Sequence, residues 1–421
     1  MRYVLIFCLA GVFSISNAQD TITLMYCHTQ AIENAPRFKD KSVLQLASDL
    51  KIENVETNWL PEMNLNGKAT YQADVITLTL ADPSIPVAFP TIPHDQYGLN
   101  LDISQMLYDG GATKAMKSLE QSSVAVDLQK VEVDLYKLKE QLNAYYFSIL
   151  ILQENRKSLE LTLENLNEKE KQLQAGIENG VILESEIKVL QVEMLKISHS
   201  MLEIDAGKKA FIKMLGTYMG SELNEDVLLQ KPDFDPSGKA EGVRPEFKWF
   251  ELKSMTLEAS KKLSKSKRLP VLFAYGQAGY GRPGYNMLND QWDLYYMIGA
   301  GLKWNIWDWS KNKREREILE QHQNIINNSR ETFEQNIMAL LVREEAKMDQ
   351  YTKSLELDER MLALQNDIAR EAGSKLENGI MTAAEYIVEV NKENMARIRL
   401  GTDKILLTQA IANYMTISGT L

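Results

Sequence analysis

The sequence predicts a mixed α and β membrane protein with an internal duplication, four strands and long coiled-coil helices. Asn-Gly turns recur at Gly180 and Gly379, 199 positions apart, and Asp109 and Asp308 are separated by the same interval. Segments that alternate apolar and polar residues precede long stretches in which apolar residues recur at spacings of 3 and 4. Because a period of two indicates a strand and a sustained 3.5 period a coiled coil, each half should contain both.

The first 18 residues are predicted to be a secretory signal peptide. Arg2 gives a positive start, residues 4–13 are apolar, and small residues at 16–18 resemble a cleavage site. The alternative is a buried N-terminal helix. After cleavage Cys27 is the one remaining cysteine, so the mature chain is expected to lack an internal disulfide.

The remaining chain is expected to divide into two structural repeats. The first repeat covers residues 19–220, a connector rich in Pro and Gly covers 221–243, and the second repeat covers 244–421. Each repeat should contain a helix, two strands and a long helical hairpin.

The four predicted strands cover residues 62–72, 99–107, 271–280 and 298–306. The first and third follow the Leu-Pro pairs at 60–61 and 269–270. Each is about ten residues long, enough for a tilted membrane crossing. The residues expected to face lipid are Leu65, Tyr71, Leu101, Ile103, Leu272, Tyr280, Leu302 and Trp304. One face of a soluble β-sandwich would give the same alternation.

Long helices are predicted at about 112–175 and 311–376, each followed by a returning helix. Residues 112–175 contain no proline, so at about 1.5 Å per residue this helix would be a rod of roughly 95 Å. No compact soluble domain needs such rods, so they are expected to project from the strand region.

Composition argues against several classes of function. The net charge of −11 and the pI of about 5.2 disfavour a nucleic-acid partner. Beyond the signal peptide no apolar run reaches 18 residues, so no membrane-spanning helix is expected. The four histidines lack metal-ligand spacing, and no catalytic motif occurs. We therefore expect no enzymatic activity, cofactor or metal.

Four strands with an apolar face cannot stand alone in lipid. Their edges would leave unpaired N–H and C=O groups, each costing several kcal/mol. Since membrane barrels begin at about eight strands, two or more copies must share one barrel. The polar face would then line a water-filled opening, and passive conduction follows from that arrangement.

The order of elements, the two Leu-Pro strand starts, the segment Arg244-Pro245-Glu246 and the two glycine turns resemble the TolC-like outer membrane efflux proteins. The resemblance covers nearly the whole mature chain. It implies a homotrimer with a twelve-stranded β-barrel, four strands per protomer, in outer-membrane lipid. It further implies a helical barrel in the periplasm, coupled to a periplasmic adaptor (membrane fusion) protein and an inner-membrane pump, for efflux or type I secretion.

The resemblance also assigns roles to the two turns. A glycine followed by five variable residues and an acid is similar to the family's periplasmic tips, on which the adaptor docks. The corresponding residues are Gly180, Val181, Ile182, Leu183, Gly379, Ile380, Met381 and Thr382. A plain helical hairpin turn is the alternative for both tips.

Two acids at the tips are candidates for the pore gate, Glu186 in the first repeat and Glu385 in the second. The family's second tip often carries two acids three residues apart, whereas here Val388 occupies the second place and Glu389 follows it. Three copies of Glu385 around a pore axis would repel one another and raise their pKa values. Glu385 could instead be an ordinary solvated helix residue.

Two other hypotheses belong to different functional classes: a coiled-coil envelope protein that conducts nothing, and an envelope enzyme. A purely structural rod needs no apolar belt with a polar reverse side, so the alternating strands argue against the first. The lack of a reactive constellation argues against the second.

Overall fold

The computed structural model describes residues 21–76, 92–178, 182–234, 242 and 244–421. The predicted signal peptide and two residues of the first tip, Gly180 and Val181, lie outside these ranges. Two compact units make up the chain. The sheet unit consists of Asp40–Val131 and Glu246–Thr332, and the tip unit of Met1–Lys39, Glu132–Pro245 and Phe333–Leu421. Each unit takes segments from both predicted repeats.

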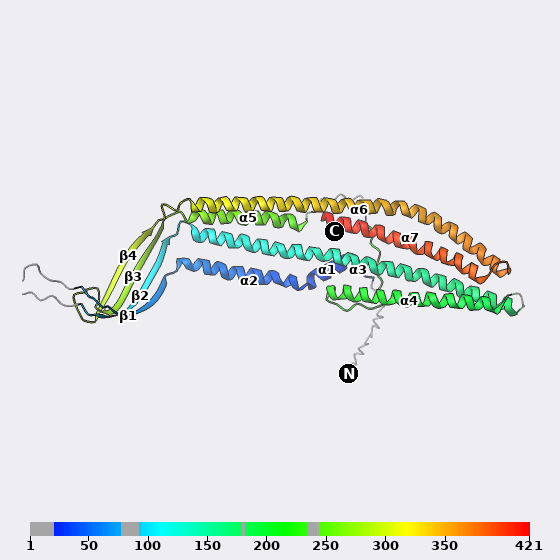
Figure 1. Cartoon of the computed structure of the whole chain (residues 1–421), viewed down its shortest axis with the longest axis horizontal. Helices are drawn as coiled ribbons and strands as arrows, with labels where there is room; N and C mark the ends of the chain where they lie inside the picture. The colour runs from blue at the N-terminus through cyan, green and yellow to red at the C-terminus, as the bar shows by residue number, and fades with distance from the viewer. Residues whose placement is uncertain (1–20, 77–91, 179–181, 235–241, 243) are drawn as a thin grey trace, which may run out of the picture. The chain divides into compact units, whose positions relative to one another are not determined.

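The described residues of the sheet unit form four strands and belong to four helices, which Figure 1 shows. The strands are β1 (Glu62–Tyr71), β2 (Asp95–Tyr108), β3 (Val271–Arg282) and β4 (Asp293–Lys303). The helices are most of α2 (Pro36–Glu56), α5 (Pro245–Ser266) and the N-terminal parts of α3 (Ala112–Glu178) and α6 (Lys311–Glu377), with a 3-10 turn η1 at Thr57–Trp59.

The strands form one antiparallel sheet in the order β1-β2-β3-β4. The register brings residues of like polarity side by side. One apolar row across the sheet is Leu65, Leu101, Ala278 and Tyr296. The neighbouring row on the other face is Asn66, Asn100, Gly279 and Tyr295. The predicted period of two therefore produces two faces of different polarity.

The fourth strand lies nearer the N-terminus than predicted, at 293–303 instead of 298–306. Trp304, expected on this strand, follows its last residue, and the indole N–H donates to the carbonyl oxygen of Arg268 at 3.1 Å. The strand can pair only where β3 offers a partner, and the last pair is Lys303 with Val271. Pro270 precedes Val271 and has no N–H to extend the ladder.

Gln105 interrupts the predicted apolar face of β2. Its side-chain amide donates to the carbonyl oxygen of Trp59 at 2.7 Å, and thereby links the strand to η1. A register irregularity between Met106 and Tyr108 follows at once. The polar residue thus marks the end of the regular ladder next to the helices.

The helices of the sheet unit lie in the order α2, α3, α5 and α6. Each neighbouring pair is linked by a hydrogen bond: Lys51 to Glu120 (3.1 Å), Thr256 to the carbonyl oxygen of Ser122 (3.1 Å), and Asn312 to the hydroxyl of Ser264 (2.9 Å). Side-chain contacts between consecutive helices therefore tie parts of both repeats into one layer.

An aspartate starts each long helix at equivalent repeat positions. The Asp109 carboxylate accepts from the backbone N–H of Gly111 (2.8 Å) and Thr113 (2.6 Å), and Asp308 accepts from the N–H of Asn312 (3.0 Å). Burial favours the neutral acid at Asp109, but the Thr113 hydroxyl and these N–H donors together outweigh it and lower the pKa of Asp109. A carboxylate here satisfies helix N–H groups that would otherwise lack partners.

The tip unit contains α1 (Leu24–Asn34), α4 (Glu184–Met219), α7 (Ala383–Ser418) and the C-terminal parts of α3 and α6 (Figure 1). α3 and α6 each contain 67 residues, and α4 and α7 each contain 36. The first residue of α6 lies 199 positions after that of α3, and the first residue of α7 lies 199 positions after that of α4. The same interval separates the two Asn-Gly turns.

Two apolar clusters hold the tip unit together. The first includes Leu24, Leu142, Tyr146, Ile212 and Leu215. The second, near the turns, includes Leu166, Leu173, Leu190, Leu376 and Tyr386. The predicted 3.5-period stripes supply many of these residues, so the coiled-coil pattern does form buried seams. None of the helices in the described part of the chain carries an apolar stretch that could span a bilayer.

Candidate functional site

The second tip is a helix-ending turn built on Gly379. The residue has a φ of +69°, its N–H donates to the carbonyl oxygen of Leu376 (3.0 Å), and the N–H of Ile380 donates to that of Lys375 (2.9 Å). These two bonds define a Schellman motif, which closes a helix with a left-handed residue. A side chain at position 379 would meet no atom within 4 Å, so this glycine faces open space.

A capping box starts α7 immediately after this turn. The Thr382 hydroxyl accepts from the N–H of Glu385 (3.3 Å), and the Glu385 carboxylate accepts from the N–H of Thr382 (3.0 Å). The backbone and side-chain donors of Thr382 lower the pKa of Glu385. Within a single chain this shift is opposite to the increase expected from repulsion between three copies.

The first tip lacks this box because Leu183 occupies the position equivalent to Thr382. Leu183 is the N-cap of α4 and provides no side-chain cap. Because the Leu183 side chain cannot accept a hydrogen bond, Glu186, the equivalent of Glu385, is not part of a capping box at the start of α4. Its carboxylate accepts instead from the N–H of Ala383 at the start of α7 (2.6 Å). Glu186 therefore joins the two tips, a role that the sequence did not predict.

The predicted docking residues separate into exposed and packed groups. Leu183 and Ile380 are 72% and 76% exposed, and Gly379 lies beside Ile380. In contrast, Ile182 and Met381 pack against the apolar cluster under the tips. A partner's contact surface on the described residues would therefore centre on Leu183, Gly379 and Ile380.

Polar side chains behind the tips connect the two hairpins. Asn391 on α7 donates to Glu193 on α4 at 2.9 Å, and Lys169 on α3 pairs with Glu377 on α6. Sequence reasoning missed these residues. A signal was present, because Glu193 sits three residues after Leu190 and four before Ile197, on the otherwise apolar face.

The polar face of the sheet carries a hydrogen-bond network across three strands. The Asp102 carboxylate on β2 accepts from Asn66 on β1 and from Gln277 on β3, each at 2.6 Å. Farther along β3 the rings of Phe273 and Tyr275 replace polar side chains on this face. These rings lie against Gly301 and Gly299, where an added Cβ would come within 2.5 Å of them.

The apolar face of the sheet is largely exposed in the single chain. Seven of the eight residues predicted to face lipid are on strands, share this face and are exposed or half-buried: Leu65, Tyr71, Leu101, Ile103, Leu272, Tyr280 and Leu302. At one end Trp292 stacks with Tyr280 (5.3 Å between centroids) and Tyr97 (5.9 Å). Clustered amphipathic rings are typical of a headgroup boundary.

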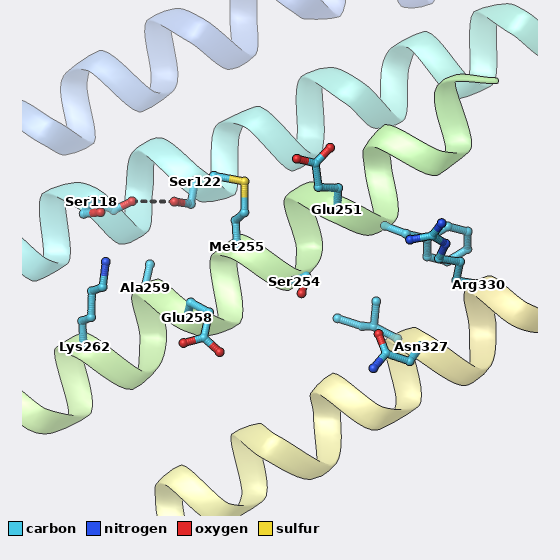
Figure 2. A pocket seen from close by; sticks show the side chains of 12 residues that line it. Ser118, Ser122, Glu251, Ser254, Met255, Glu258, Ala259, Lys262, Asn327 and Arg330 are labelled. Atoms are coloured by element: carbon cyan, nitrogen blue, oxygen red, sulfur yellow. Dashed lines mark hydrogen bonds between the residues drawn. The ribbon is translucent and has the colours of Figure 1, made fainter. Parts of the chain in front are cut away.

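A cavity of about 390 Å³ lies between α3, α5 and α6 in the sheet unit (Figure 2). Its acids are engaged in ion pairs, Glu251 with Lys248 (2.8 Å) and Glu258 with Lys261 (2.7 Å). The hydroxyl of Ser122 donates to the carbonyl oxygen of Ser118 (2.9 Å). This arrangement offers no activated nucleophile with a base. Among the described residues, no cluster of three or more His, Cys, Asp or Glu could hold a metal ion.

Comparisons with known proteins locate this fold among membrane channels. No family model and no curated protein matches the sequence. The solved outer-membrane channel OprN matches 94% of this chain over 90% of its own, with 14% identity and a TM-score of 0.68. The open state of the Neisseria gonorrhoeae MtrE channel matches 94% of this chain over 89% of its own length, with 14% identity and a TM-score of 0.67. The Campylobacter jejuni CmeC channel matches 94% of this chain over 85% of its own length, with 13% identity and a TM-score of 0.65.

The chain therefore has the fold of TolC-like outer membrane channels, as the sequence predicted. The three solved structures are described as channels, not as enzymes. At these identities the likeness concerns the fold, and the specific activity must be argued from the residues of this chain.

Proposed function

We propose that this protein is one protomer of a homotrimeric outer-membrane channel in an efflux or type I secretion system. It conducts substrates passively from a periplasmic adaptor and an inner-membrane pump to the exterior. The sheet lies in outer-membrane lipid, and the helices project into the periplasm as a helical barrel.

The sheet with two unlike faces carries this proposal. Its exposed apolar face, with aromatic rings clustered at one end, suits a bilayer. The reverse face holds the hydrogen-bonded Asn66, Asp102 and Gln277, which suit a water-filled lumen. A protein that serves only as a rod has no need of either face.

The sheet edges support assembly of several copies. Among the described residues, β1 and β4 each pair with one neighbouring strand, so each leaves one edge for another strand. In lipid these edges must be paired. A barrel that joins β4 of one copy to β1 of the next satisfies them, and three copies give the twelve strands of the expected barrel.

Exposed apolar stripes on the helices support the same assembly. In the tip unit, α4 carries Val192, Leu195 and Leu202, and α6 carries Leu357 and Leu364, all exposed. Their spacings fit the 3.5-residue coiled-coil period, although other residues form the buried seams. We assign these stripes to contacts between neighbouring protomers.

The tips serve as the adaptor-docking and gating end in this proposal. Leu183, Gly379 and Ile380 present the exposed docking surface. Glu186 and Glu385 lie at the start of α4 and α7, where their charges can act on a pore. The contact of Glu186 with the N–H of Ala383 holds the tips together in one arrangement and would have to break if they separated.

The proposal is tested by cell fractionation, gel migration without heating, and conductance of the purified protein in planar bilayers. We expect an outer-membrane protein that migrates as a trimer and forms discrete channels. A soluble monomer would reject the channel and favour a non-conducting coiled-coil envelope protein. A membrane-bound trimer without conductance would reject the conducting role alone.

A further inference from the structure

The segment between β3 and β4 follows a path fixed by charged side chains. Arg282 donates to both carboxylate oxygens of Asp290, from Nε at 2.7 Å and Nη2 at 3.3 Å. Its Nη1 reaches Asp95 at the start of β2 at 3.4 Å. Within the segment, the N–H of Asn289 donates to the carbonyl oxygen of Asn286 at 3.0 Å. These bonds give residues 283–292 a defined direction relative to the sheet.

Two aromatic residues of this segment lie on opposite faces of the sheet. Trp292 stacks on Tyr280, which belongs to the apolar face. Tyr285 contacts the other face, since its phenolic O–H donates to Oε1 of Gln277 at 2.6 Å. Its ring centroid also lies 4.5 Å from that of Tyr295. The segment therefore places one ring over the polar face.

The polar assignment of this face rests on the register. Gln277 pairs with Asp102, whose carboxylate it also binds, and Tyr295 pairs with Gly279. The Tyr295 ring lies against Gly279, where an added Cβ would come within 2.6 Å of it. Tyr285 therefore adds a second aromatic ring next to one that already covers the sheet, and 51% of its surface is exposed.

The ends of the strands show which mouth of the channel this would be. α2 leads into β1 through η1, and β2 leads into α3. The other ends of β1 and β2, at Tyr71 and Asp95, and the segment 282–293 therefore lie at the end of the sheet opposite to the helices. If the helices are periplasmic, as in the proposed function, the loop of Tyr285 is at the outer mouth.

We propose that Tyr285 forms a constriction at the outer mouth of the channel, where its three copies limit the size of the solute that passes. This inference rests on the proposed function, because the polar face must line the lumen. A twelve-stranded barrel with strands about 4.8 Å apart and tilted by about 40° has a backbone radius of roughly 12 Å. Three Tyr285 rings, added to the side chains that already line the barrel interior, therefore occupy a substantial part of the opening.

The constriction is tested by labelling a cysteine placed beyond it. Ser104 is exposed on the same polar face, two residues past Asp102 and farther from the loop end. A Ser104→Cys protein is treated on intact cells with a small methanethiosulfonate and, separately, with a maleimide attached to a bulky polymer. Cys27 is fully buried and should contribute no background.

With Tyr285 present, we expect the small reagent to label Cys at position 104 readily and the bulky reagent to label it slowly. Tyr285→Ala should accelerate the bulky reaction several-fold and leave the small one unchanged. Tyr296→Ala removes an equal ring from the apolar face, where Tyr296 is 74% exposed, and should alter neither rate. Migration of each variant as a trimer without heating checks that assembly is intact.

Each contrary result has a separate meaning. An unchanged bulky rate in Tyr285→Ala, or an equal increase in Tyr296→Ala, overturns the constriction and leaves the channel in place. Failure of the small reagent to reach position 104 in any variant rejects the water-filled lumen, and the proposed function and the constriction then fall together.

Discussion

At the scale of single residues, the two tips carry different residues at the equivalent N-cap positions of the repeat. Thr382 caps α7, whereas Leu183 at the equivalent position caps nothing. The two acids follow from this difference. Glu385 closes its own capping box, while Glu186 reaches the other tip. One substitution at an N-cap thus changes which backbone N–H a nearby carboxylate can serve.

A bulky side chain at Gly379 should impair adaptor coupling and leave the trimer intact. Space is open there, so the direct cost is the positive φ, about 1–2 kcal/mol for a residue with a Cβ. Gly379→Trp should reduce crosslinking to the adaptor and substrate efflux. Gly379→Ala introduces the same strain with little bulk and is the matched control. Normal efflux in the Trp variant would remove Gly379 from the docking surface.

Replacement of Glu385 by glutamine should change the cation sensitivity of single-channel conductance. Glutamine also completes a capping box, so the fold of the tip should persist while the negative charge is lost. Block by divalent cations should weaken in Glu385→Gln. Glu389→Gln removes an equal charge one turn further along α7 and serves as the control. Identical cation block in wild type and Glu385→Gln would place Glu385 away from the pore.

His28 should make the stability of the tip unit depend on pH. Burial lowers its pKa to about 4 from 6.5, although the hydrogen bond to Asn143 acts in the opposite direction. The unfolded chain therefore binds the proton more readily than the folded chain. Stability is fully present above pH 6.5 and is lost as pH falls toward about 4, by roughly 3 kcal/mol from this group.

Thermal unfolding in detergent at a series of pH values measures this effect. The apparent Tm of the wild type should decrease as the pH is lowered from 6.5 to 4. A His28→Gln variant, which cannot take up the proton, should show a flatter profile over the same interval. Parallel profiles for the two proteins would show that other groups cause the loss.

At the scale of elements, the helices present two kinds of apolar stripe. Buried stripes, such as those that contain Leu142 on α3 and Leu190 on α4, form the two apolar clusters of the tip unit. Other stripes, on α4 and α6, remain exposed in the single chain. The sequence indicated coiled coils but not which stripe packs within a chain, because both kinds have the same period.

A charge on an exposed stripe should weaken assembly more than it weakens the fold. Leu195 on α4 is 70% exposed, so Leu195→Lys removes little packing within the chain. If the stripe contacts a neighbouring protomer, the lysine is buried without a partner and the trimer dissociates more easily. Gel migration without heating should show loss of trimer, with helix content by circular dichroism retained. Leu195→Met is the conservative control, and a stable trimer in the lysine variant would contradict the assigned contact.

The sheet shows what limits strand prediction. The first and third strands were located by alternation and by the Pro residues before them. The second was located by alternation alone and begins at Asp95 instead of Leu99. The fourth was displaced toward its C-terminal side. Tyr295 and Met297 lie on the polar face and hide the alternation at the start of β4. The true limits of β4 depend on where β3 supplies partners, which is a property of the pair and not of one segment.

At the scale of the whole molecule, the two faces of the sheet should respond differently to charge. Leu65 and Asn64 are neighbours in β1 on opposite faces. Arg at a lipid-facing midplane position costs about 2–4 kcal/mol in membrane barrels, so Leu65→Arg should reduce the amount of trimer in the outer membrane. Asn64→Arg places the same charge in the lumen and should be tolerated. Equal losses from both variants would argue against the assigned faces.

The sequence by itself determined the fold class, the order of the elements, the 199-residue offset and the positions of both tips. These features follow from local periodicity and turn chemistry, which a single segment carries. Tertiary structure decided that Ile182 and Met381 pack inward while Leu183 and Ile380 face outward, that Glu186 binds the opposite tip, and that Tyr285 lies over the polar face. Each of these depends on segments far apart in the chain, and a contact between them leaves no periodic signal in either one.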